Sequence, residues 1–309
     1  MWFKQIQLFH LTTPIKFSVN GIIEKLEPFA FKSCLPSMPA SSGWISPLDE
    51  DDSPLARGIN GCVMITLQVE EKILPASVVN QTLKEKLKQI ELNEARKVGQ
   101  KEKATMKDEV TFTLLPRAFS KFTQIKAYID TRNQWLVLNT ISPARTELFI
   151  SFFKKTFGDG ICSLDIVKPS TIVTTWLKNQ DYPEVFSVEK SCVLQDPNQQ
   201  SRMIRCQQQD LFSTSIQSLV KDGCEAVQIA LCWHDKIQFV LADDLSLRSV
   251  RLAEEDLAEI KEIAETKQQR FDADLIMMSE MFAGLIKDLL SVFQKRQETS
   301  SEKKLAIAV

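Results

Sequence analysis

Several residue types and sequence patterns are scarce in this chain, and each shortage excludes a class of protein. The 309 residues include only two histidines, so we do not expect a histidine-rich zinc site. No apolar run approaches the roughly 18 residues that a membrane span requires, and Met1–Gln5 does not open like a signal peptide. The seven cysteines are odd in number and form no C-x-x-C pair, which is typical of reduced, buried thiols. We therefore expect a cytoplasmic protein with no membrane partner.

Signatures of nucleotide binding and of metal-dependent hydrolysis are also missing. A lone G-x-G lacks the other glycines of a dinucleotide site, and no G-x-x-x-x-G-K-[ST] motif occurs. Asp243 and Asp244 fit a turn. Asp272 and Asp274 stand two apart on an expected helix, so they do not share a face. We therefore expect no enzyme, no metal and no cofactor.

What the chain does contain is an ordinary globular composition, with 44% hydrophobic and 25% charged residues. Its apolar periodicity predicts an α+β fold in which helices pack on antiparallel sheets. We expect strands at 2–11, 62–69, 122–129, 135–138, within 183–194, at 202–211, and in a meander at 226–233, 237–241 and 247–252. We expect helices at 19–27, 143–157, 170–178, 214–220 and 271–293. The proline- and serine-rich stretch 34–60 is predicted to be a loop, and the tail from Gln297 to be disordered.

Two apolar features leave alternatives open. The helix at 271–293 carries an apolar stripe that Met277, Met281 and Leu290 widen, and it packs on a sheet or forms a methionine-rich groove for a partner. The stripe consists of Phe271, Leu275, Met278, Phe282, Leu285, Leu289 and Phe293. Trp44, the one large residue of the loop-like stretch, anchors that stretch to the body or offers a platform on which a base can stack. We favour packing and anchoring.

The stretch 70–126 predicts a charged helical hairpin that protrudes from the body. After Pro75, a helix of about 20 residues places Leu83, Leu87 and Ile90 on one narrow apolar face and ends near Gly99. Thr105, with Asp108 three positions later, resembles a capping box and predicts the start of the second helix, which Pro116 stops.

The basic charge of the chain is concentrated in this hairpin. Residues 76–127 carry eleven Lys and Arg against six Asp and Glu, a net +5 in a chain whose total is −2, whereas 253–296 carries a net −4. Charge alone favours a solvated helix face with i,i+4 pairs. An uneven distribution can also hold a nucleic acid on one surface and repel it from the rest.

Four short stretches resemble the signature segments of the recombination-associated protein RdgC family. They are Trp2-Phe3-Lys4, Glu70-Glu71-Lys72-Ile73-Leu74-Pro75, Leu114-Leu115-Pro116-Arg117-Ala118-Phe119-Ser120 and Gln269-Arg270-Phe271-Asp272-Ala273-Asp274. The resemblance implies a ring-shaped homodimer that encircles double-stranded DNA without reading its sequence and restrains the RecA recombinase. It also implies a nucleoid-associated location, and it leaves open whether single-stranded DNA binds.

The resemblance gives the hairpin a role and suggests site residues. The basic side chains expected to face phosphates, without sequence choice, are Lys84, Lys88, Arg96, Lys97, Lys101, Lys103, Lys107, Arg117, Lys121 and Lys126. The residues before Gln209-Asp210-Leu211 can be lysines in the family pattern, but here they are Gln207 and Gln208, so we assign Gln208 and Gln209 only as amide contacts. Leu114, Leu115 and Phe119 form a candidate dimer contact, with a core role as the alternative.

We expect three domains. These are a central α+β domain at 1–75 and 119–168, a helical hairpin tip at 76–118 and a base α+β domain at 169–309. The rival function, from another class, is a protein-interaction module whose charged hairpin binds a protein partner. DNA affinity with a steep salt dependence distinguishes the two, because a protein-binding arm would show little of either.

Overall fold

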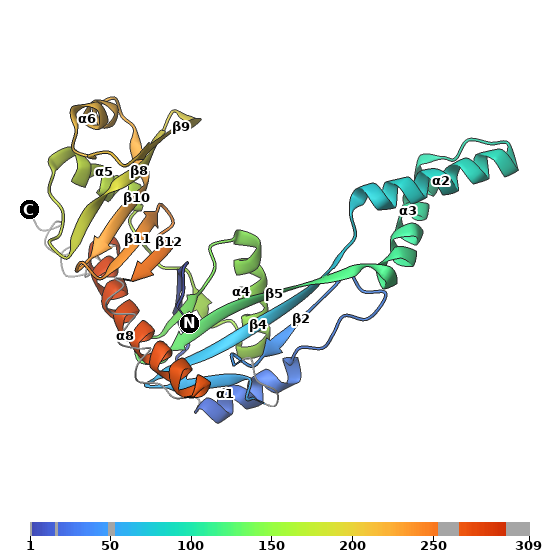
Figure 1. Ribbon diagram of the computed structural model, residues 1–309, viewed down its shortest axis with the longest axis horizontal. Coiled ribbons are helices and arrows are strands. Elements are labelled where there is room, and N and C mark those ends of the chain that lie inside the picture. Colours follow the sequence, from blue (N-terminus) through green and yellow to red (C-terminus); the bar gives the residue numbers. More distant parts are fainter. Residues whose placement is uncertain (1, 16–17, 49–52, 253–265, 295–309) are drawn as a thin grey trace, which may run out of the picture. The chain divides into compact units, whose positions relative to one another are not determined.

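The computed structural model of the 309-residue chain describes all residues except 1, 16–17, 49–52, 253–265 and 295–309 (Figure 1). The chain divides into two units. The first unit consists of Met1–Val19, Arg57–Met64 and Ala127–Val309, and the second of Asn20–Ala56 and Ile65–Lys126. Part of the acidic stretch 253–296 and the tail from Gln297 lie outside the described residues.

The fold is α+β with antiparallel sheets, as the sequence predicts. The first unit contains a five-stranded sheet in the order β12-β11-β10-β8-β9. Its strands are β8 (Phe186–Asp196), β9 (Gln199–Gln207), β10 (Glu225–Trp233), β11 (Ile237–Ala242) and β12 (Leu247–Leu252). Leu231 lies opposite Phe239 in the ladder between β10 and β11. The predicted three-strand meander is therefore confirmed.

Aromatic side chains join the helices to one face of this sheet. The ring of Trp176, on α5 (Pro169–Asn179), lies 6.2 Å from Phe186 of β8 and 5.7 Å from Phe293, measured between ring centroids. The shorter α6 (Thr214–Lys221) buries Ile216 and Val220 and begins after Ser213. These helices lie beside one face of the sheet (Figure 1). Polar side chains line a hollow formed by its strands.

Helix α8 (Lys267–Phe293) is the longest helix of the first unit. It begins with a capping box in which Thr266 and Gln269 bond each other's backbone N–H groups. Its predicted apolar stripe is buried, and the indole N–H of Trp233 on β10 donates to Asp288 at 2.8 Å. The helix therefore packs on the sheet, as we favoured.

The first unit also holds part of the larger sheet, with strands β6 (Trp135–Leu138), β1 (Gln7–Leu11) and β7 (Ile161–Cys162) side by side. The last residues of β5 (Phe119–Asp130) pair with β6 through a turn at 131–134, as predicted. The Asp130 carboxylate holds that turn by accepting the backbone N–H groups of Arg132 and Asn133. Helix α4 (Pro143–Phe157) ends at Gly158, whose φ of 95° suits glycine.

The expected loop at 34–60 is wrong, because this stretch contains two strands. Strand β2 (Ala40–Ile45) pairs with β4 (Cys62–Ile73), and β3 (Ala56–Ile59) also pairs with β4. Gly43 lets the backbone of Phe31 approach so closely that a Cβ there would lie 2.3 Å from it. Trp44 is 1% exposed, so it anchors this stretch and offers no base-stacking platform. The predicted helix at 19–27 is confirmed as α1 (Val19–Leu26).

Two helices connect β4 to β5, and we call them, with the connecting residues 95–99, the helix pair. Helix α2 (Ala76–Glu94) follows Pro75, and α3 (Gln100–Leu114) leads through a short 3-10 turn, Leu115–Arg117, into β5 (Figure 1). The predicted start at Thr105 is wrong, because α3 begins after Gly99 and the Thr105 hydroxyl donates to the Lys101 carbonyl within the helix. Gly99 caps α3 and does not end α2, which ends at Ala95 in a left-handed conformation.

Membrane insertion finds no support in the described helices. None of the described helices combines the length and the apolar character needed to cross a membrane. The three-domain division and the antiparallel packing of the two helices as a hairpin stay predictions.

Candidate nucleic-acid interface

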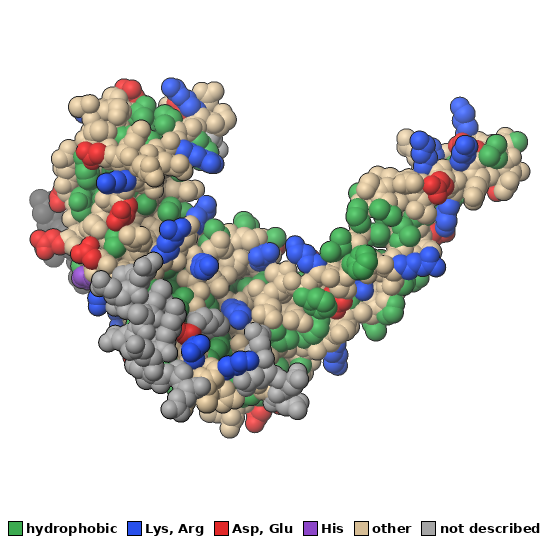
Figure 2. All heavy atoms as spheres, in the orientation of Figure 1, with side chains coloured by type: hydrophobic (Ala, Val, Ile, Leu, Met, Phe, Trp, Pro, Cys, Tyr) green, Lys and Arg blue, Asp and Glu red, His purple; other side chains and the backbone are tan. Residues whose placement is uncertain are grey.

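The helix pair exposes most of its lysines to solvent. Lys84 and Lys88 lie one turn apart on α2, and Lys103 and Lys107 one turn apart on α3. These four side chains are exposed, as are Lys97 and Lys101, and no ion pair involves any of them within the described part of the chain. Figure 2 shows Lys and Arg side chains spread over this end of the second unit. The surface therefore offers uncompensated positive charge.

Apolar packing within the helix pair is sparse, which explains this exposure. The buried residues are Val79 on α2, Val110 on α3 and Val98 in the connection. The stripe predicted from the sequence, Leu83, Leu87 and Ile90, is only half-buried. A helix with so small an apolar face keeps its charged side chains in water.

Arg96 differs from the other predicted contacts. Its guanidinium pairs with Glu94 at 2.6 Å and with Glu102 at 2.7 Å, so its charge is already compensated. These two carboxylates raise the pKa of Arg96, with the Glu102 hydrogen bond as the largest cause.

The remaining predicted basic contacts lie where the chain leaves the helix pair. Arg117 and Lys121 are exposed, whereas Lys126 is half-buried on β5. No ion pair involves Arg117 or Lys121 among the described residues. These two side chains extend the basic surface onto the start of β5.

The candidate dimer contact is only partly exposed. Phe119 is 84% exposed and Leu114 is half-buried, but Leu115 is only 6% exposed. The expectation of an exposed Leu115 is wrong, because the 3-10 turn that Pro116 imposes directs this side chain inward. Phe112 and Phe122 are exposed at 61% and 56%, and sequence reasoning did not include them in the apolar group.

A buried carboxylate fixes the strands that lead to and from the helix pair. Glu70 on β4 is 4% exposed and accepts the Ser120 hydroxyl at 2.6 Å and the Cys34 backbone N–H at 2.7 Å. These hydrogen bonds, that of Ser120 first, lower the pKa of Glu70. Two of the signature stretches, 70–75 and 114–120, therefore meet at this hydrogen bond.

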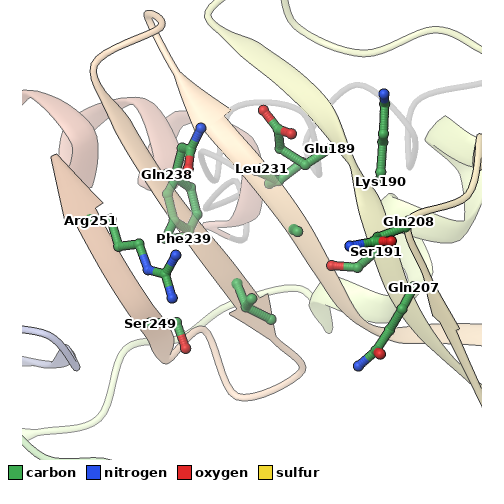
Figure 3. Close-up of a pocket in the computed structure, with 12 residues that line it drawn as sticks. Glu189, Lys190, Ser191, Gln207, Gln208, Leu231, Gln238, Phe239, Ser249 and Arg251 are labelled. Atoms are coloured by element: carbon green, nitrogen blue, oxygen red, sulfur yellow. The ribbon is translucent and has the colours of Figure 1, made fainter. Parts of the chain in front are cut away.

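The first unit carries a second polar surface, formed by the strands of the five-stranded sheet. A hollow of about 400 Å³ is lined by polar side chains from β8, β9, β11 and β12, including Lys190, Gln207, Gln208 and Arg251 (Figure 3). A neighbouring hollow of about 320 Å³ adds Arg205, Arg248 and Gln228. We call these two hollows together the sheet face.

The sheet face is basic, because Glu189 is the one acid among its lining residues, against Lys190, Arg205, Arg248 and Arg251. Sequence reasoning missed these four. Gln207 and Gln208 line the face as the resemblance suggested, whereas Gln209 does not. Gln209 instead donates its backbone N–H to the Lys190 carbonyl.

A strand irregularity explains why the arginines of β12 were missed. Residues three apart on a regular strand point to opposite faces, so Arg248 and Arg251 should not share one. Ser249 has a φ of 51°, and the register between β11 and β12 shifts at this point. This bulge turns both arginines to the sheet face. The Nε atom of Arg248 is buried there and has no hydrogen-bond partner among the described residues.

A comparison with protein families decides the family membership. A family model described as "Putative exonuclease, RdgC" matches residues 1–296. The chain belongs to the RdgC family. The resemblance drawn from the four signature stretches is thereby confirmed.

Curated RdgC proteins are similar to the chain over nearly its whole length. The recombination-associated protein RdgC of Yersinia pestis (strain Pestoides F) is 34% identical over 293 residues, which cover 94% of this chain and 97% of that protein. The protein of the same name from Yersinia enterocolitica serotype O:8 is 33% identical over the same length. The names of these relatives support a role in recombination.

The two names within the RdgC family differ on enzymatic activity. The family description names an exonuclease, whereas the curated relatives are named for recombination alone. Within the part of the chain that the structure describes, no group of three or more His, Cys, Asp or Glu side chains is placed to hold a metal ion. Neither name establishes an activity for this chain.

Proposed function

We propose that this protein is a homodimer that encircles double-stranded DNA without sequence preference and restrains RecA-dependent recombination. The observation that carries the proposal is the set of exposed lysines on the helix pair that no described carboxylate compensates. Side chains of this kind bind phosphates through counterion release, which gives affinity without sequence choice. The relatives are named recombination-associated proteins, which supports a role for this DNA binding in recombination.

The sheet face supports the same ligand from the first unit. Arginine forks bind phosphate oxygens in pairs, and glutamine amides can donate to phosphates as well. Arg248 lines the second hollow of the sheet face, where its guanidinium adds positive charge. We therefore add Arg205, Arg248, Arg251 and Lys190 to the proposed DNA contacts.

A ring requires two separate contacts between the protomers, and two-fold symmetry allows both if each is isologous. We propose that Leu114 and Phe119 form one of them, with Leu115 supporting them from within the chain, and that the helix pair folds as a helical hairpin at that tip. Phe119 supports this assignment because an aromatic ring 84% exposed is costly to leave in water. The second contact belongs to the base domain within 169–309.

Such a ring needs no chemistry to act. By occupying the duplex it hinders growth of a RecA filament and strand exchange, and it works on nucleoid DNA in the cytoplasm without metal or nucleotide. We accordingly propose that the protein is not an enzyme. The domain division that suits the ring is a central domain at 1–75 and 119–168, a tip at 76–118 and a base at 169–309.

The second candidate function is the exonuclease that the family description names. Incubation of end-labelled linear DNA with the purified protein and magnesium or manganese tests it. We expect intact DNA. Shortening of the label that follows the protein through purification, and that a chelator stops, would contradict our proposal.

Binding to a random-sequence duplex across a salt series tests the main proposal. With roughly eight phosphates contacted per protomer, and so about sixteen per dimer, log K should fall against log salt with a slope of about −14. Duplexes of different sequence should give the same affinity. A slope near zero would contradict the proposal and favour a helix pair that binds a protein partner.

A further inference from the structure

The connection between α2 and α3 is short and fixed at both ends. Helix α2 ends at Ala95, which has a φ of 50°, and α3 begins after Gly99. Between them, Val98 is 6% exposed and so is held against the helices. Five residues thus connect the two helices, and one side chain in this connection makes every ion pair described for the helix pair.

That side chain is Arg96. Its Nε donates to Glu94 at 2.6 Å, and its Nη1 and Nη2 donate to the two oxygens of Glu102, each at 2.7 Å. Glu94 is the last residue of α2, and Glu102 lies in the first turn of α3. A planar guanidinium can hold two carboxylates in fixed positions in this way, which the point charge of a lysine cannot do.

Glu102 has a second role in the same turn. It stands three residues after Gly99, the residue that caps α3, where a glutamate can take part in a capping box. The Arg96 hydrogen bond is the largest cause that lowers the pKa of Glu102. A negative charge at this position also favours the helix N-terminus. Arg96 and Glu102 together therefore stabilise the start of α3.

The neighbours of Arg96 have the opposite character. Lys97 and Lys101 follow it in the sequence, are exposed, and have no described ion pair. For Arg96 to bind a phosphate it would have to release two carboxylates, which would then repel the DNA. We propose that Arg96 is a positioning residue that clasps α2 to α3 and so presents Lys97 and Lys101 to the DNA backbone, and that it does not itself contact phosphate.

This inference rests on the proposed function. It predicts that removing an acidic side chain weakens DNA binding, which is the opposite of the usual effect. Removing an acid from a DNA-binding surface normally strengthens binding. Removing Glu102 opens the clasp, so Glu102→Gln should weaken duplex binding about fivefold, because the lysines lose their preorganised placement. The matched control is Glu91→Gln on α2, which removes the charge of an exposed acid that has no described ion pair. The control should leave binding unchanged or tighten it by up to about twofold.

Substitution of Arg96 distinguishes two roles of this side chain, which are to hold α2 to α3 or to bind a phosphate. Arg96→Lys keeps the positive charge but loses the planar guanidinium that binds two carboxylates, so it should weaken binding as much as Glu102→Gln does. The double variant Arg96→Lys, Glu102→Gln should bind no more weakly than either single variant. The exchange of the two residues, Arg96→Glu with Glu102→Arg, should restore most of the affinity. In the free protein, hydrogen exchange of the amides at 99–103 should accelerate about tenfold in both single variants and should stay unchanged in Glu91→Gln.

The outcomes are distinguishable from failure of the proposed function. Tighter binding by Glu102→Gln, together with full affinity in Arg96→Lys, would show that Arg96 is a phosphate contact and would overturn the inference. If the wild-type protein bound no duplex, the proposed function would fail, and with it the role of the clasp in presenting lysines. Hydrogen exchange of the amides at 99–103 would then test the contact between Arg96 and Glu102 by itself. Unaltered exchange in both Arg96→Lys and Glu102→Gln would refute it.

Discussion

Reversing the charge of Lys97 and Lys101 should remove two phosphate contacts from the helix pair. Both side chains are exposed and neither has a described ion pair, so the double variant Lys97→Glu, Lys101→Glu breaks no ion pair of the described residues. Each contact contributes about −0.9 to the slope of log K against log salt, and the homodimer carries each substitution twice, so the slope should become shallower by about 3.6. At roughly 0.1 M salt this amounts to a loss of about 4,000-fold in affinity.

The assay is fluorescence anisotropy with a labelled random-sequence duplex over a range of salt concentrations. The control is Lys221→Glu, Lys287→Glu, which makes the same change in net charge at exposed positions on α6 and α8, outside both proposed surfaces. Its slope should equal that of the wild type. Equal losses in the two double variants would show that net charge alone governs binding, and would refute a localised contact at the helix pair.

Three further predictions concern the sheet face, the tip and the strands beneath it. Arg248→Gln should weaken duplex binding and, because the dimer carries the substitution twice, make the salt slope shallower by about 1.8 in the same assay. An unchanged slope would exclude this arginine as a contact. Phe119→Ala should leave the unfolding temperature of the protomer nearly unaltered and weaken dimer formation as measured by sedimentation. Leu115→Ala should instead lower the free energy of unfolding by about 2–5 kcal/mol. Equal effects of the two variants on unfolding would contradict the burial assigned to these side chains. Because the folded state lowers the pKa of Glu70, its stabilisation is complete above about pH 5 and lost as the pH falls below about 4. Glu70→Gln should therefore lower the unfolding temperature at neutral pH and lose that difference in acid, and a difference independent of pH would refute the role of its charge.

Local periodicity made much of the fold predictable. Helix α8 and the meander of β10, β11 and β12 follow patterns that repeat every few residues, and neighbouring segments form them. Strand β2 was missed because its serines and the prolines around it favour a loop. Its pairing with β4 joins Trp44 to Leu67, a contact between distant parts of the sequence that no local pattern reveals.

The candidate site was predictable in part, for a similar reason. The lysines of the helix pair are visible in the sequence because they are close together, and exposure follows from the narrow apolar stripe. The start of α3 was misplaced because Thr105 with Asp108 resembles a capping box, whereas the helix begins after Gly99. The basic sheet face depends on a bulge at Ser249 and on side chains from five strands, so only the folded chain shows it.

Retention on circular and linear DNA tests the proposed encirclement most directly. The protein is bound to a closed circular plasmid and to the same plasmid cut once, and both are then washed in salt high enough to abolish phosphate contacts. A closed ring should stay on the circle and slide off the cut plasmid. Equal release from both would contradict encirclement and leave a surface that binds DNA by charge alone.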